Sequence, residues 1–174
     1  MRRLSLLSIL VVLAASSLVA QVYSAEQIEV APPAPRVEAP STTATPAELE
    51  KRGDELRSTK AYLDAIDYYQ SALAKAPGNA VVLNKMGIVE MHLQRYRDSM
   101  RDFRKSIKAD RTYADAYNNL GVIYYLQKNY KKAIGEYQKA LQVRPDSAPY
   151  YGNLGAAYFA RKEPDKAMAA YLQA

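Results

Sequence analysis

The chain has 174 residues and a formal net charge of +6, 49% of its residues are hydrophobic, and it contains no cysteine. The absence of cysteine excludes disulfides, cysteine-ligated metals, a thiol nucleophile and the acylation site of a bacterial lipoprotein. The length suits one ordinary domain, and the positive charge permits anionic partners without identifying one.

The first predicted element, residues 1–24, is a signal peptide. A short basic start precedes an apolar run, which gives way to small residues by Ala20. This order is typical of secretory signals, with cleavage after Ala20 or Ser24. The alternative is an uncleaved anchor in the inner membrane, because residues 4–22 are long enough to span a bilayer. In either case we expect an exported protein, periplasmic or secreted if the signal is cleaved.

The second predicted element, residues 25–45, is a proline-rich linker. Five of the nine prolines lie between residues 26 and 46, and no hydrophobic period accompanies them. Such segments favour an extended polyproline II conformation, which reaches on the order of 60 Å over some twenty residues. We expect this linker to be disordered and to act as a tether or spacer.

From residue 46 onward the sequence repeats itself every 34 residues. The two later copies share an aromatic residue, a Leu-Gly pair, a second aromatic residue and then Ala, an aromatic residue and Ala, with Pro after the first of them. In the clearest copy these residues are Tyr117, Leu120, Gly121, Tyr124, Ala133, Tyr137, Ala140 and Pro145. The first copy keeps the spacing with Leu49 and Gly53, and a weaker second copy keeps it with Leu83, Met86 and Gly87. A fixed period of this length indicates supersecondary units, each stacked on its neighbour. The predicted repeats span residues 46–79, 80–113, 114–147 and, incompletely, 148–174.

The period and the shared residues resemble those of the tetratricopeptide repeat family. The resemblance implies an all-α fold, a right-handed superhelical solenoid of about 3.8 stacked helix-turn-helix repeats. Thr45 and Glu48 fit a capping box around Pro46 at the start of the first helix. The repeated glycines indicate a close approach of helices, with Ala133 predicted opposite Gly121.

The resemblance also implies a peptide-binding groove, which the first helix of each repeat lines. Carried onto this sequence, the family's peptide-binding positions are Asn84, Lys85, Ile88 and Met91, then Asn118, Asn119, Val122 and Tyr125, then Asn153, Ala156 and Phe159. Asn can donate and accept at once, so it suits an extended peptide backbone, and the apolar members suit side chains. The family's clamp for C-terminal carboxylates is not expected, because Glu50 and Asp54 replace two of its residues.

The sequence offers no chemistry for an enzyme. His92 is the only histidine, no phosphate-binding glycine loop is present, and no metal-spaced cluster occurs, so we expect no catalytic residue, no metal and no cofactor. The segment from Arg95 to Arg111 contains seven basic residues and three aspartates. We interpret them as a solvated helix face rather than a nucleic-acid site, because no stacking aromatic residues or groove-reading motif accompany them.

The sequence therefore predicts an exported tetratricopeptide-repeat scaffold that binds a protein or peptide in its groove, with no nucleic acid as partner. Membrane contact is expected only through an uncleaved N-terminal segment. Two alternatives stay open: a membrane-anchored assembly factor of an envelope complex, and the N-terminal interaction module of a longer enzyme. The sequence predicts neither the partner's identity nor the oligomeric state.

Overall fold

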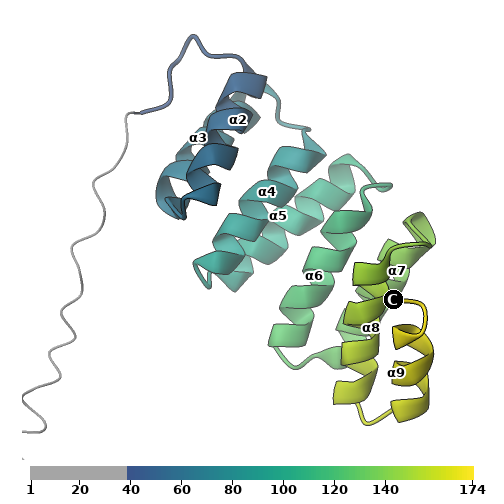
Figure 1. Ribbon diagram of the computed structural model, residues 1–174. Coiled ribbons are helices and arrows are strands. Elements are labelled where there is room, and N and C mark those ends of the chain that lie inside the picture. The colour runs from purple at the N-terminus through teal and green to yellow at the C-terminus, as the bar shows by residue number, and fades with distance from the viewer. Residues whose placement is uncertain (1–38) are drawn as a thin grey trace, which may run out of the picture. The chain divides into compact units, whose positions relative to one another are not determined.

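The computed structural model describes residues 39–174, so the predicted signal peptide, with its alternative anchor at residues 4–22, and most of the predicted linker lie outside the described residues. The described part of the chain contains eight α-helices and no β-strand (Figure 1). In chain order they are α2 (Pro46–Ser58), α3 (Tyr62–Lys75), α4 (Ala80–His92), α5 (Tyr96–Ala109), α6 (Ala114–Leu126), α7 (Tyr130–Val143), α8 (Ala148–Ala160) and α9 (Pro164–Tyr171). Within residues 39–174, no helix combines the length and apolar character needed to cross a membrane.

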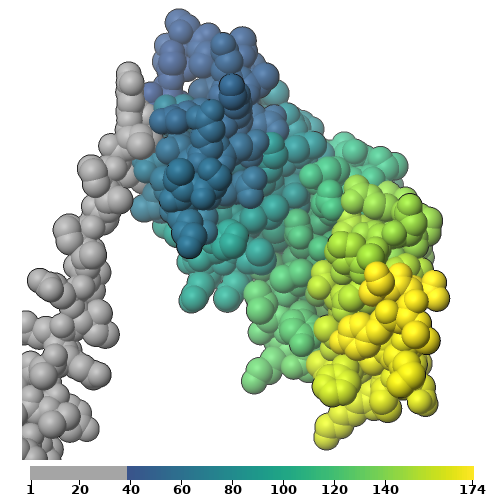
Figure 2. Space-filling view, viewed as in Figure 1, coloured from purple at the N-terminus to yellow at the C-terminus, as the bar shows by residue number. Residues whose placement is uncertain are grey.

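The helices pack in successive pairs. α2 packs on α3, α4 on α5, α6 on α7 and α8 on α9, and each second helix also packs on the first helix of the following pair. In the space-filling view the colours therefore follow one another across the molecule from blue to yellow (Figure 2). This arrangement confirms the prediction of an all-α repeat solenoid.

The two kinds of helix form two faces. The first helices α4, α6 and α8 contact one another in sequence, and no comparable contact joins successive second helices of residues 39–174. We call the side formed by α2, α4, α6 and α8 the inner face, and the side formed by α3, α5, α7 and α9 the outer face.

The start of α2 is fixed by its own side chains. The Thr45 hydroxyl accepts a hydrogen bond from the Glu48 amide, and the Thr45 amide donates to the Glu48 carboxylate at 2.7 Å. Pro46 occupies the first turn, where a missing amide hydrogen costs nothing. The predicted capping box is thus present.

The turn inside each pair has the same geometry in all four repeats. After α6, the backbone amide of Lys128 donates to the backbone carbonyl of Tyr125, and that of Asn129 donates to the carbonyl of Tyr124. This is a Schellman pattern, which satisfies carbonyls at the helix end. Lys128 has a φ of 58°, in the left-handed region that favours glycine. The equivalent residues with positive φ are Lys60, Gln94 and Lys162.

In each helix pair, an aromatic ring of the second helix lies against a glycine of the first helix. A Cβ atom added to Gly121 would lie 2.6 Å from the ring of Tyr137. The corresponding pairs are Gly53 with Tyr69, Gly87 with Phe103 and Gly155 with Tyr171. The Tyr137 ring, and not the predicted Ala133, is therefore the group closest to Gly121. This buried ring fills the space that a side chain at residue 121 would need.

The side of α2 that corresponds to the side of α4 packed on the preceding repeat is polar rather than apolar. In α4 the third, seventh and tenth residues, Val82, Met86 and Val89, are buried in the core shared with α2 and α3. The residues at the same places in α2 are Glu48, Arg52 and Glu55, all exposed. At the other end of the array, the apolar side chains of Met168 on α9 and of Leu172 just after it are exposed.

Candidate functional site

Asparagine side chains link successive first helices on the inner face. The Asn119 amide group donates to Asn84 Oδ1 at 3.0 Å, and the Asn153 amide group donates to Asn118 Oδ1 at 2.8 Å. Asn118 also donates to Asn119 at 3.3 Å. We call these four residues the amide ladder.

The amide ladder differs from the free row of asparagines that the sequence suggested. Its members bind one another across the repeats, because residues 35 apart in sequence come face to face on consecutive first helices. Asn84 is only 3% exposed, so it supports Asn119 and offers no surface to a partner. Asn118, Asn119 and Asn153 are half-buried. Because an amide group has two protons and two lone pairs, these three keep capacity for a further hydrogen bond.

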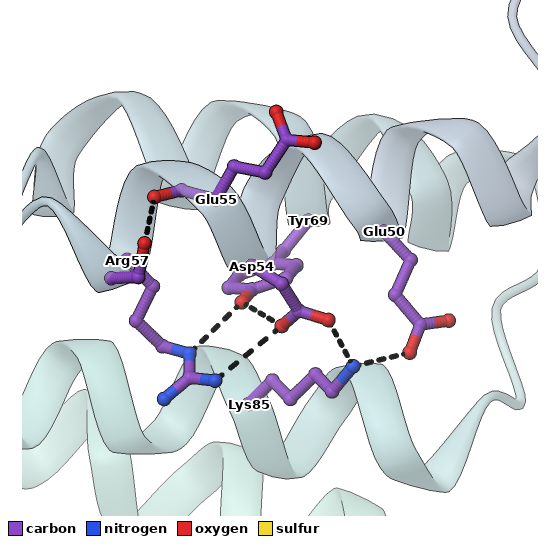
Figure 3. Close-up of polar contacts among 7 residues, drawn as sticks. Glu50, Asp54, Glu55, Arg57, Tyr69 and Lys85 are labelled. Atoms are coloured by element: carbon purple, nitrogen blue, oxygen red, sulfur yellow. Dashed lines mark hydrogen bonds and ion pairs between the residues drawn. The ribbon is translucent and has the colours of Figure 1, made fainter.

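At the first repeat the same link is ionic. Figure 3 shows the Lys85 ammonium group between two carboxylates, with Nζ 2.6 Å from Glu50 Oε1 and 2.5 Å from Asp54 Oδ2. The Tyr69 hydroxyl donates to Asp54 at 2.7 Å and accepts from Arg57. This ionic cluster joins α2, α3 and α4.

The pKa shifts in the ionic cluster follow from these contacts. Burial acts to lower the pKa of Lys85, but hydrogen bonds and charge from Asp54 and Glu50 outweigh burial and raise it. Burial acts to raise the pKa of Asp54, but the hydrogen bonds from Lys85 and Tyr69 and nearby positive charge lower it overall. Lys85 is therefore a paired cation, and the positive charge that a carboxylate-terminated ligand would need is already neutralised.

Apolar side chains lie beside the amide ladder on the same helices. Ile88 and Met91 on α4, with Val122 and Tyr125 on α6, are half-buried and pack on the core cluster beneath them. On α8, Ala156 is half-buried and Phe159 is 69% exposed. We call these six residues the apolar strip. The inner face thus combines paired amides with accessible apolar surface.

All seven basic residues between Arg95 and Arg111 are exposed, and some of them also make contacts within the protein. Arg101 lies 2.6 Å from Asp98 and 3.2 Å from Asp102, and Arg104 donates to the Tyr124 hydroxyl at 2.9 Å. The Arg104 bond crosses from α5 to α6. The run is therefore an exposed helix face, as the sequence suggested, and these contacts tie part of it to aspartates of α5 and to α6.

Two buried carboxylates in the second repeat were not identified from the sequence. Glu90 and Asp102 each have a buried carboxylate oxygen that makes no hydrogen bond. Burial raises the pKa of Glu90, and it also raises the pKa of Asp102 against the effect of Arg101. A signal was present for Glu90, because the equivalent residues of the other repeats are Leu56, Tyr124 and Tyr158.

The described residues contain no group suited to a metal ion. No cluster of three or more His, Asp or Glu side chains within residues 39–174 is placed to hold one. His92 stacks on the Tyr62 ring with centroids 5.1 Å apart. This contact gives His92 a packing role between α4 and α3.

The paired helices, their 34-residue period and the linked first helices define a helical repeat protein. Residues 114–147 and 148–174 each match a family model described as the tetratricopeptide repeat. Residues 114–174 of the chain are therefore tetratricopeptide repeats. Among curated proteins, none matches the sequence.

Several solved structures share the fold at low sequence identity. A crystal structure of MamA is 23% identical, with 74% of this chain and 75% of that chain covered and a TM-score of 0.68. MamA from Desulfovibrio magneticus RS-1 is 22% identical over 74% of this chain and 72% of that chain, with a TM-score of 0.66. The first repeat domain of Spaghetti (RPAP3), bound to an HSP90 peptide, is 19% identical over 68% of this chain and 94% of that chain, with a TM-score of 0.65. At these identities the likeness concerns the fold.

Proposed function

We propose that this protein-interaction scaffold binds an extended, apolar segment of a partner protein along its inner face. The observation that carries the proposal is the apolar strip, which leaves Tyr125, Met91 and Phe159 accessible beside polar groups that can meet a backbone. Burying such side chains against a partner is favourable at about 25 cal/mol per Å² of apolar surface. The peptide-bound repeat domain of Spaghetti (RPAP3) supports the general use of this fold for peptides.

The charge on the inner face favours an uncharged ligand over an acidic one. Lys85 is held by Glu50 and Asp54, and an acidic peptide would have to compete with both carboxylates. The three half-buried members of the amide ladder, Asn118, Asn119 and Asn153, carry no charge, and they suit any peptide backbone regardless of its sequence. We therefore propose that specificity comes from apolar side chains seated on the strip.

The test is a binding titration with a partner captured on the repeat region and identified. Tyr125→Ala should weaken binding by about tenfold or more, because accessible aromatic residues carry much of the energy of such interfaces. Lys131→Ala is the matched control on the outer face, where Lys131 is exposed. Melting curves establish that both variants fold. Normal binding by folded Tyr125→Ala, with loss in Lys131→Ala, would move the site to the outer face.

We also propose that the protein is exported and acts outside the cytoplasm as a binding protein rather than an enzyme. The order of basic, apolar and small residues at the N-terminus supports this. Mass measurement of the protein from the envelope and secreted fractions tests it. A mass that begins after Ala20 or Ser24 indicates cleavage, and an intact N-terminus in the membrane fraction indicates the anchor. Recovery of the intact protein from the cytoplasm alone would refute export.

A further inference from the structure

The outer face carries a hollow that the proposed function does not use. It has a volume of about 490 Å³ and lies where α3 and α5 flank α4. Leu83 and Met86 of α4 are buried in its lining, with Leu73 and Pro77 on one side and the stems of Lys105 and Lys108 on the other. Its size lies within the range of about 300–1,000 Å³ that small-molecule sites occupy.

The side chain at the fourth place of the second repeat bears on the size of this hollow. Leu83 holds that place, Leu49 holds it in the first repeat, and Tyr117 and Tyr151 hold it in the third and fourth repeats. Tyrosine is longer and wider than leucine, and Tyr117 packs in the corresponding position against Ala114, Ala140 and their neighbours. The shorter Leu83 leaves space between α3 and α5 that a ring would occupy.

The polar part of the hollow is positively charged. Lys105 and Lys108 lie one helical turn apart on α5 and are exposed, and no carboxylate is among the lining residues. Lys105 Nζ is 3.8 Å from Asp102 Oδ1, beyond hydrogen-bond distance, and Asp102 already has Arg101 at 3.2 Å. Among the ion pairs of residues 39–174, none involves Lys108. Both ammonium groups are therefore available to an anion.

We propose that this hollow binds an anionic amphiphile, a single hydrocarbon chain with a carboxylate or phosphate headgroup. The chain would lie on Leu73, Pro77, Leu83 and Met86, and the headgroup would lie between Lys105 and Lys108. Apolar lining favours the hydrocarbon, and hydrogen bonds to charged groups are the stronger ones. The site is on the opposite face from the apolar strip, so both can be occupied together.

The probe is dodecanoate, titrated below its micelle concentration into the full chain, with dodecyltrimethylammonium as the cation of equal chain length. Dodecanoate should bind saturably at one molecule per chain, and the cation at least tenfold more weakly. Leu83→Tyr should reduce dodecanoate binding at least tenfold by filling the hollow. The double variant K105Q/K108Q should reduce it similarly. The matched control is K131Q/K132Q on α7, which removes the same charge and should bind as the unmodified chain does.

Melting curves and lipid vesicles distinguish the possible results of these titrations. Lys108 lies in the last turn of α5, where a cation also stabilises the helix end, so melting curves accompany every variant. Should Leu83→Tyr fail to fold, the lysine pair and the cationic probe still decide the result. Equal binding of both probes, no saturable binding, or binding untouched by folded Leu83→Tyr would each overturn the proposal. Vesicles of anionic and of zwitterionic lipid distinguish a free amphiphile from a membrane lipid. Binding to anionic vesicles that depends on the lysines but not on Leu83 would indicate a flat surface contact and refute the hollow.

Discussion

At the scale of single residues, the second repeat carries a carboxylate where its neighbours are apolar. Glu90 is 6% exposed, and its nearest cation, Arg95, is 3.6 Å away. Because its folded-state pKa is raised, the folded protein binds the proton more tightly than the unfolded chain does. Its contribution to stability is therefore fully present below the unfolded pKa and is lost as the pH rises through the folded pKa. Asp102 acts in the same direction.

The variant Glu90→Leu should consequently be more stable than the unmodified protein at pH 7. The first repeat already holds a buried leucine, Leu56, at the same place. Removing an ionised carboxylate without a hydrogen bond on its buried oxygen should raise the free energy of unfolding by about 1–3 kcal/mol. Denaturant unfolding at pH 4.5 and pH 7 measures this, and the gain should be larger at pH 7. A variant that is less stable at pH 7 would mean that Arg95 compensates the charge.

A second residue-scale prediction concerns the glycine and ring pairs. Helix propensity alone would favour Gly121→Ala by about 1 kcal/mol, but the new methyl group would meet the Tyr137 ring at 2.6 Å. We expect a net loss of about 1–3 kcal/mol from overpacking. Gly135→Ala on α7 is the control, because nothing lies within 4 Å of its added Cβ, and it should gain about 0.5–1 kcal/mol. Thermal or denaturant melts that move both variants in the same direction would contradict the role given to the ring.

At the scale of elements, the residue with positive φ between the two helices of each pair is strained, because in none of the four repeats is it a glycine. Lys128 adopts a φ of 58° and has a side chain, whereas glycine adopts this conformation without strain. Lys128→Gly should therefore stabilise the protein by about 1 kcal/mol. Lys131→Gly, in the first turn of α7, should instead cost helix propensity, by at most about 1 kcal/mol. Unfolding curves of the two variants give the comparison, and a loss in Lys128→Gly would show that its side chain makes a compensating contact.

The helices themselves were the most predictable elements. Pro at a repeat end, the Thr45 capping box and the 34-residue period predict where helices begin and end, because these features act through the local backbone. The left-handed turn was not predicted, since Lys60, Gln94, Lys128 and Lys162 share no residue type typical of that conformation. Its regularity comes from the geometry of the turn rather than from one residue.

At the scale of the whole molecule, the sequence predicted which helices form the inner face. It did not predict the hydrogen bonds and ion pairs that join those helices. The repeat pattern assigned Asn119 and Asn153 to the first helices, but it did not show that each would bind the asparagine 35 residues before it. That offset is one more than the 34-residue period, so the paired asparagines do not occupy equivalent places in their repeats. The Lys85 cluster with Glu50 and the outer hollow beside Leu83 likewise depend on neighbours from different repeats.

The amide ladder leads to a prediction on how the repeats stabilise one another. Stability in such arrays is roughly a sum of terms within repeats and between neighbouring repeats. Asn119→Ala would leave Asn84 Oδ1 without its partner in a buried position. An unsatisfied buried acceptor costs about 1–3 kcal/mol. Asn153→Ala removes the equivalent bond from Asn118, which is half-buried. Water can replace that bond, so its loss should cost less than about 1 kcal/mol.

Denaturant unfolding of both single variants tests this difference, and the slope of the transition reports cooperativity. Asn119→Ala should lower the midpoint more than Asn153→Ala, and it should reduce the slope if repeats 46–79 and 80–113 begin to unfold apart from the rest. The surface variant Lys131→Ala serves as the control and should stay within about 0.5 kcal/mol of the unmodified protein. Equal losses for the two asparagine variants would show that burial of Asn84 does not set the strength of the ladder. The apolar core and the hydrogen bond from Arg104 to Tyr124 would then account for the coupling between repeats 80–113 and 114–147.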